Sequence, residues 1–142
     1  MNSVILKTAA GYLLPLLLLF SVFILLRGHY LSGGGFVGGL VASIAFVLHA
    51  FAHGFDNAKR IFRRDPGFLI PIGLILCFTM GVAPMFFGEP FMKGLWIERT
   101  FPVIGSVGTA LFFDIGVFIV VIGVTLTILF TISESNQEQD EI

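Results

Sequence analysis

The sequence predicts an all-α integral membrane protein with four transmembrane helices, at about residues 6–26, 33–54, 67–87 and 105–132. Of its 142 residues, 56% are hydrophobic and only 12% are charged, whereas a soluble domain carries about 25% charged residues. The charges fall in clusters, and each long gap between clusters matches the roughly 20 apolar residues that a helix needs to span a bilayer. Runs such as residues 16–20 lack the apolar/polar alternation that is typical of a transmembrane β-barrel.

The first predicted span, 6–26, differs from a secretory signal peptide. Its apolar run exceeds the roughly 7–15 residues of a signal-peptide core, and no small-x-small cleavage site follows it. Arg27 follows instead, so we expect this helix to remain in the mature protein.

The distribution of Lys and Arg between the loops predicts the orientation. Five basic residues would share one side of the membrane and three the other: Lys7, Lys59, Arg60, Arg63 and Arg64 against Arg27, Lys93 and Arg99. Because cytoplasmic loops carry an excess of Lys and Arg, both termini are predicted to be cytoplasmic. Residues 1–132 then form the membrane domain, and residues 133–142 form an acidic, solvated and frayed cytoplasmic tail.

Two loops carry further signals. Residues 89–99 contain Trp96 among apolar residues and follow Pro84, so we expect a short segment at the membrane interface rather than a continued helix. The basic loop 56–66 is typical of a topology-setting segment, although such a run can also bind anionic lipid.

Glycines dominate the start of the second predicted span. On a helix, Gly34, Gly38 and Ala42 recur every four residues, and Gly35, Gly39 and Ser43 run beside them. Small residues at this spacing let helix backbones approach closely in lipid. A phosphate-binding loop is the alternative, but no Gly-Lys-Ser/Thr follows. The spacing is compatible with a close contact inside the chain and with one to another subunit.

Asp114 is the one formal charge well inside a predicted span, somewhat to the outer side of its midpoint. A carboxylate there costs about 2.5–3.5 kcal/mol on insertion scales, so intramembrane carboxylates are candidates for proton or cation handling. A structural alternative is a hydrogen bond to a neighbouring helix. Gly116 and Gly123, seven residues apart, form a separate packing face on the same helix.

His49 and His53 lie four residues apart, and therefore on one face of the second span. They can relay protons, since imidazole titrates near neutral pH, or simply contact headgroups, as His29 can at the opposite boundary. No third ligand with metal-site spacing accompanies them, and Cys77 is the only cysteine. We therefore expect no metal, cofactor, disulfide or enzymatic site, and a net charge of −1 gives no reason to expect a nucleic-acid partner.

Two motifs resemble the MnhB-type (MrpB) component of the multisubunit Mrp cation/proton antiporters. Residues 27–39 resemble its R-G-H-x-x-x-G-G-G-F-x-G-G signature, and residues 108–117 resemble its G-T-x-x-x-x-D-I-G-V signature. The resemblance covers about residues 6–132. It implies a bacterial cell-membrane complex of six or seven different subunits that exchanges Na⁺ for H⁺.

The implied role is a transporter subunit that packs in the membrane complex and lines part of an ion path. The alternative is a purely structural scaffold or assembly subunit, with every ion-handling group elsewhere. A small metal-dependent membrane enzyme using His49 and His53 is a third hypothesis, which metal analysis would test.

Overall fold

Four long helices form most of the computed structural model. The structure describes residues 4–27, 34–56, 60, 65–86, 88, 96–101 and 105–141, with the backbone alone over 96–101 and 105–110. The elements in chain order are α1 (Val4–Arg27), α2 (Gly34–His53), a 3₁₀ turn η2 (Pro66–Phe68), α4 (Leu69–Phe86), strands β1 (Trp96–Phe101) and β2 (Gly105–Gly108), and α5 (Thr109–Asp140). Four of the described helical segments are long and apolar enough to cross a membrane, so the predicted four-span helical architecture is confirmed.

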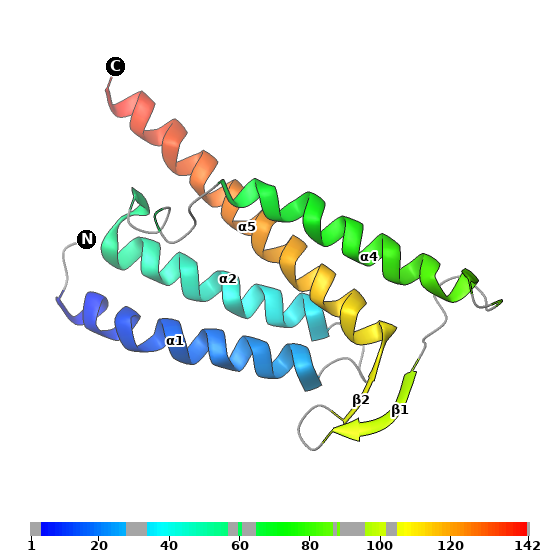
Figure 1. The fold of residues 1–142 in the computed structure, drawn as a ribbon. Coiled ribbons are helices and arrows are strands. Elements are labelled where there is room, and N and C mark those ends of the chain that lie inside the picture. The colour runs from blue at the N-terminus through cyan, green and yellow to red at the C-terminus, as the bar shows by residue number, and fades with distance from the viewer. Residues whose placement is uncertain are drawn as a thin grey trace.

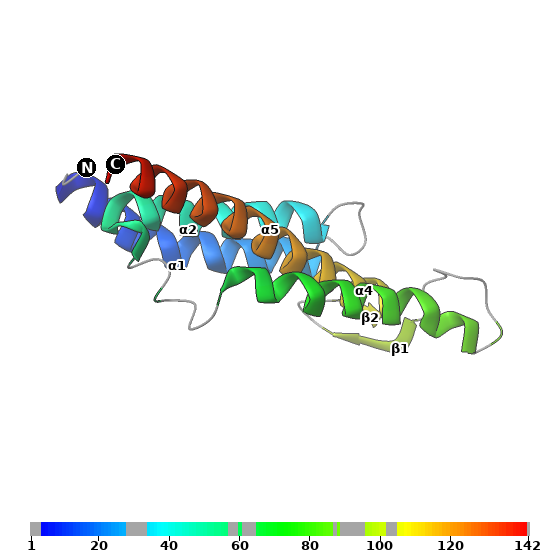
Figure 2. The same ribbon diagram turned by 90° about the horizontal axis from the view of Figure 1, so that it is seen from above.

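The helices lie side by side in the order α1, α2, α5, α4 (Figure 1). α2 packs on α1 and on α5, and α4 packs mainly on α5, so α1 and α4 occupy the two outer positions. Both chain termini lie at one end of the molecule, as the view from above also shows (Figure 2). An even number of spans brings the two termini to the same end, because each span reverses the direction of the chain.

α2 occupies the centre because its residues are small. Its buried residues are all Gly, Ala or Ser: Gly34, Gly35, Gly38, Gly39, Ala42, Ser43, Ala45, Ala50 and Ala52. Without a hydrophobic force between helices in lipid, close van der Waals packing has to hold them together. Larger side chains fill the space where α2 meets the second half of α5, around Ile122, Leu126 and Phe130.

Local sequence signals explain where helices begin and end. α2 ends at His53, and Gly54 follows with φ of 93°, donating its N–H to the Ala50 carbonyl at 2.9 Å. This is the left-handed cap that glycine adopts most easily. Before α4, the Asp65 side chain accepts a hydrogen bond from the Gly67 N–H at 3.0 Å, and Pro66 occupies the first position of η2.

A two-stranded antiparallel hairpin precedes α5, which the sequence pattern did not predict. β1 pairs with β2 through Thr100 opposite Ser106 and Phe101 opposite Gly105, with an irregular register toward Trp96. β1 is rich in aromatic and β-branched residues, which favour strands. Residues 105–108 (Gly-Ser-Val-Gly) are poor helix formers, so the helix starts at Thr109, four residues later than predicted.

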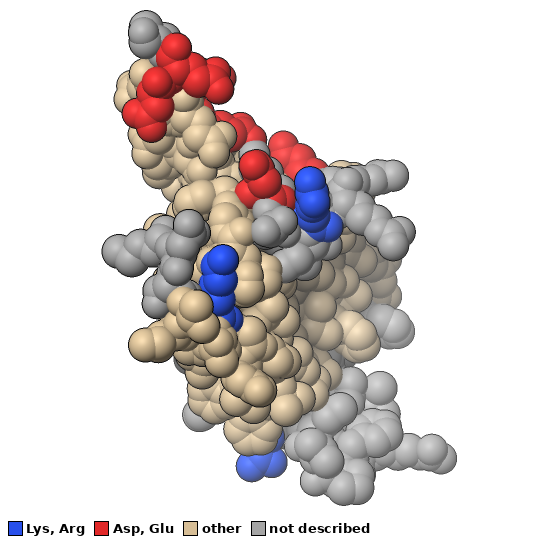
Figure 3. All heavy atoms as spheres, turned by 90° about the vertical axis from the view of Figure 1, so that its left-hand side faces the viewer, with Lys and Arg blue, Asp and Glu red and all other residues tan. Residues whose placement is uncertain are grey.

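α5 also continues past the predicted end of its span at residue 132. It reaches Asp140, because Glu, Gln and Ser residues propagate a helix and neither Gly nor Pro interrupts them. The predicted acidic tail therefore forms the exposed last two turns of this helix rather than a frayed end. Acidic side chains gather along it at the end of the molecule that holds the termini (Figure 3).

Several predicted features lie outside the described residues. They are His29, the basic residues Lys59, Arg63 and Arg64, and positions 89–95 of the predicted interfacial segment.

The α1–α2 contact yields a prediction about Gly38. A Cβ atom at this position would lie 2.9 Å from the Ser21 carbonyl oxygen on α1, closer than real Cβ contacts allow. We expect Gly38→Leu to separate the helices and to lower stability by at least the roughly 1–3 kcal/mol of overpacking. Thermal denaturation of the purified full chain in detergent would measure this.

Gly11→Leu is the matched control, because a Cβ at Gly11 on α1 meets nothing within 4 Å. An equal loss of stability in both variants would contradict the proposed contact.

Candidate functional site

Asp114 lies in the second turn of α5, close to the hairpin. It follows the start of the helix at Thr109 by five residues, about 8 Å along the axis. The carboxylate therefore lies nearer to the hairpin end of the span than the predicted helix start at 105 implied. The residue is half-buried.

Backbone contacts on two sides fix this part of α5. On the α2 side, a Cβ at Gly35 would collide with the Asp114 carbonyl group, whose carbon lies 3.0 Å from that position. On the α4 side, the Cβ positions of Gly73 and Gly116 lie 2.6 and 2.8 Å from each other's carbonyl oxygens. Asp114 therefore lies where three helices approach as closely as their backbones allow.

α4 also supplies a polar neighbour to this part of α5. The Cys77 thiol donates to the Phe113 carbonyl at 3.5 Å and lies within electrostatic range of the Asp114 carboxylate. A thiol is a weak donor, so this hydrogen bond links α4 to α5 but contributes little to stabilising a charged carboxylate. Because Cys77 sits in a continuous apolar run, its sequence context gives no direct sign that it faces α5.

The other predicted glycines also lie at helix contacts. Gly39 faces α5, where its Cβ would lie 2.8 Å from Val121 Cβ, and Gly123 faces the start of α4, 3.1 Å from Leu69 Cβ. Gly34 is buried on α2. Close approach within the chain thus involves the predicted glycines on both α2 and α5.

His49 and His53 form a pair at the opposite end of α2. Their ring centroids are 4.6 Å apart, with planes inclined at 37°. The Nδ1 atom of His49 is buried and has no hydrogen-bond partner among the described residues. Gly35 marks the level of Asp114 on α2, and His49 follows it by fourteen residues, about 21 Å along the helix. The structure therefore does not bring the histidines and Asp114 together.

Two further polar groups lie near the histidine pair, and no sequence motif predicts their position there. Lys7 of α1 lines a hollow together with His53. Thr127 on α5 has a buried hydroxyl with no partner among the described residues, near Gly67 and Asp65. Neither residue stands in a motif, and only the packing of separate helices reveals their surroundings.

Within the described part of the chain, no group of three His, Cys, Asp or Glu side chains is placed to hold a metal ion. The two described regions thus present the Asp114 carboxylate at one end of the helices, and the His49–His53 pair with the Lys7 ammonium at the other.

Comparison with known proteins places this arrangement among antiporter components. A family model described as a domain related to the MnhB subunit of Na⁺/H⁺ antiporter matches residues 5–127. The chain is 37% identical over 135 residues to the B-type component of the Na⁺/H⁺ antiporter of Bacillus subtilis, covering 94% of both chains. It is 34% identical to putative antiporter subunit mnhB2 of Staphylococcus epidermidis, covering 93% of this chain and 95% of that one.

A solved structure also matches. Part of the Mrp complex from Dietzia sp. DQ12-45-1b superimposes with a TM-score of 0.73 and 32% sequence identity. The match covers 87% of this chain and spans only 13% of that longer chain.

The α4–α5 crossing predicts non-additive effects of two glycine substitutions. Gly73→Ala and Gly116→Ala each insert a methyl group into the same backbone contact, so each should cost about 1–3 kcal/mol. Once one methyl has separated the helices, the second meets less resistance. The double variant should therefore lose less than the sum of the single losses, by about 0.5 kcal/mol or more. Denaturation of the full chain and all three variants in one detergent measures this, and strictly additive losses would contradict a shared contact.

Proposed function

Because this chain belongs to the MnhB family, we propose that it is the B-type component of a multisubunit Na⁺/H⁺ antiporter in a bacterial cell membrane. The observation that carries the proposal is 37% identity to the B-type component of the Bacillus subtilis antiporter along 94% of both chains. On this proposal the chain is a transporter component and not an enzyme.

The distribution of charge supports action with partner subunits. Asp114 is the only charged residue between positions 105 and 132, and among the other three spans the charges are confined to Lys7 and Arg27, near the ends of α1. An ion path across a bilayer needs polar groups at successive depths, since an unpaired charge in hydrocarbon is costly. Partner subunits would supply the remaining groups. The large apolar side chains that face outward, such as Phe20 and Phe78, would then contact lipid or those partners.

Asp114 is the residue of this chain that we assign to ion or proton handling. The contacts of Gly35 on α2 with the Asp114 backbone and of Gly73 on α4 with Gly116 fix the stretch of α5 that carries this side chain. A carboxylate that alternates between protonated and ionised forms can exchange H⁺ for Na⁺.

We assign His49 and His53 to proton exchange at the other end of the span. The imidazoles are adjacent, and one buried nitrogen of His49 is available to a proton or to a partner's polar group. Groups on other subunits would bridge the roughly 21 Å to the level of Asp114.

The proposed orientation rests on the Lys and Arg distribution. With both termini cytoplasmic, the histidine pair at the end of α2 would lie near the cytoplasmic surface, and Asp114 near the start of α5 would lie nearer the external surface. The acidic end of α5 would then project into the cytoplasm (Figure 3).

The proposal predicts the effect of Asp114→Asn. Asparagine keeps the size of the side chain but cannot ionise, so Na⁺-dependent proton movement in everted vesicles should fall at least about tenfold, equivalent to about 1.4 kcal/mol in the barrier. The complex should still assemble, as judged by co-purification of its subunits. Asp56→Asn is the matched control, because Asp56 is exposed beyond the end of α2.

Two outcomes would contradict the transport role. Unchanged antiport in Asp114→Asn would remove the residue from the ion path. Loss of the assembled complex would instead favour the alternative, a scaffold subunit in which Asp114 holds helices together.

A further inference from the structure

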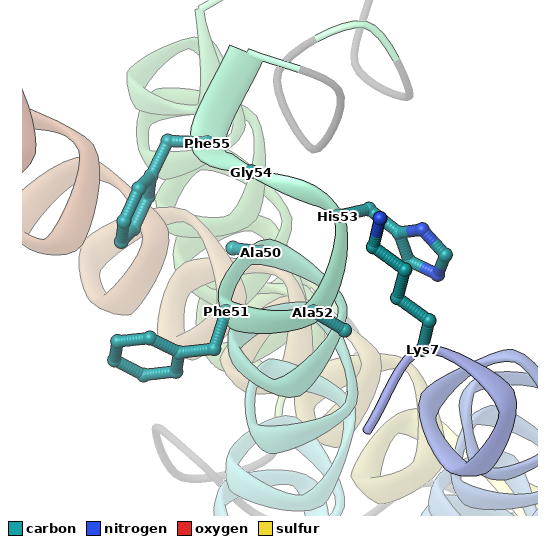
Figure 4. Close-up of a pocket in the computed structure, with 7 residues that line it drawn as sticks. All are labelled: Lys7, Ala50, Phe51, Ala52, His53, Gly54 and Phe55. Atoms are coloured by element: carbon teal, nitrogen blue, oxygen red, sulfur yellow. The ribbon is translucent and has the colours of Figure 1, made fainter. Parts of the chain in front are cut away.

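Lys7 and His53 lie close together at one end of the α1–α2 pair, although they are 46 positions apart in the sequence. They line a hollow of about 300 Å³ with residues 50–52, 54 and 55. The Lys7 side chain extends from α1 alongside the His53 imidazole, whereas Phe51 and Phe55 point to the opposite side of the turn (Figure 4). The polar side of the hollow is therefore formed by an ammonium and an imidazole from two different helices.

The Lys7 ammonium is the formally charged group among the described lining residues of the hollow. None of its lining residues is acidic. Among the described residues, the Lys7 ammonium has no carboxylate partner, although Asp56 follows the hollow closely in the chain. His49 stacks against His53 and adds a buried Nδ1 atom that likewise has no described partner.

The depth of the hollow identifies the class of anion. Lys7 directly precedes the uncharged run that begins at Thr8, and His53 is the last residue of α2. Both side chains therefore lie where the hydrocarbon ends and the phosphates of the headgroups begin. Lysine near a helix end extends toward this layer and attracts anionic lipid.

We propose that the Lys7–His53 hollow binds a phosphate group, and that at this depth the phosphate is the headgroup of an anionic phospholipid. Lys7 supplies the permanent charge, and His53 supplies an N–H donor from the second helix, so one phosphate would join α1 to α2. The carbonyl groups at the end of α2 oppose an anion, but the Gly54 N–H already occupies that of Ala50. This site is independent of the role of Asp114.

Lipid titration followed by native mass spectrometry tests the proposal. The full chain, purified with its partner subunits in a neutral detergent, is titrated with phosphatidylglycerol and, separately, with phosphatidylcholine. Lys7→Gln should weaken retention of one phosphatidylglycerol about fivefold, since one basic residue at a membrane surface contributes about 1 kcal/mol. His53→Gln should weaken the same lipid by a smaller factor.

Arg27→Gln is the matched control, because it removes one charge from the other end of α1, far from the hollow. An equal loss in Arg27→Gln, or unchanged retention in Lys7→Gln, would overturn the proposal.

A titration with inorganic phosphate distinguishes the two sources of the anion. Lysine-dependent thermal stabilisation by phosphate over chloride at equal ionic strength, without selective lipid retention, would assign the hollow to a free phosphate. Selective retention of phosphatidylglycerol without that stabilisation would assign it to the lipid headgroup. If Lys7→Gln changed the response in neither the lipid titration nor the phosphate titration, the proposed phosphate site would be overturned altogether.

Discussion

The close approach of α2 to α1 and α5 is the contact on which the rest of the structure depends. Lipid tails are as apolar as the helix surfaces, so burial of hydrophobic area gives no force to bring helices together. α2 meets its neighbours through Gly, Ala and Ser, and at Gly38 and Gly39 it leaves no room for a Cβ atom. α4 joins the assembly through the same kind of contact at Gly73, so four spans are held with few large buried side chains.

This mode of packing also determines what Asp114 can do. A carboxylate carried on a loosely held helix would move toward water, because its burial is costly. Here close contacts at Gly35 and Gly116 hold the α5 backbone on the α2 side and on the α4 side. On the proposed role of Asp114, packing and ion handling depend on the same helix crossing, so a substitution that loosens this crossing would disturb both.

Much of the fold was predictable from sequence, and the exceptions have physical causes. The gaps between charges located the spans, because a bilayer excludes charge over a fixed length. The hairpin of residues 96–108 and the long end of α5 were not predicted, since aqueous segments lack that constraint and follow local propensity instead. Gly35 and Asp114 are far apart in the chain, so predicting their contact would have required knowing which helices pack against each other. Predicting that Lys7 lies beside His53 would have required the same information.

The separation between the histidine pair and Asp114 constrains how such a component can work. About 21 Å of α2 lies between His49 and the level of Asp114, and its buried face is made of glycine, alanine and serine. Side chains this small offer no charged group to a passing ion, yet they let a neighbouring helix come close. The surfaces that α1 and α4 turn outward are apolar and have no partner helix among the described residues of this chain. If Asp114 handles ions as proposed, a continuous path past it requires polar groups from helices that belong to other subunits. On the proposed role, the low charge of this sequence and the small residues of α2 both fit a subunit that forms an ion path only together with its partners.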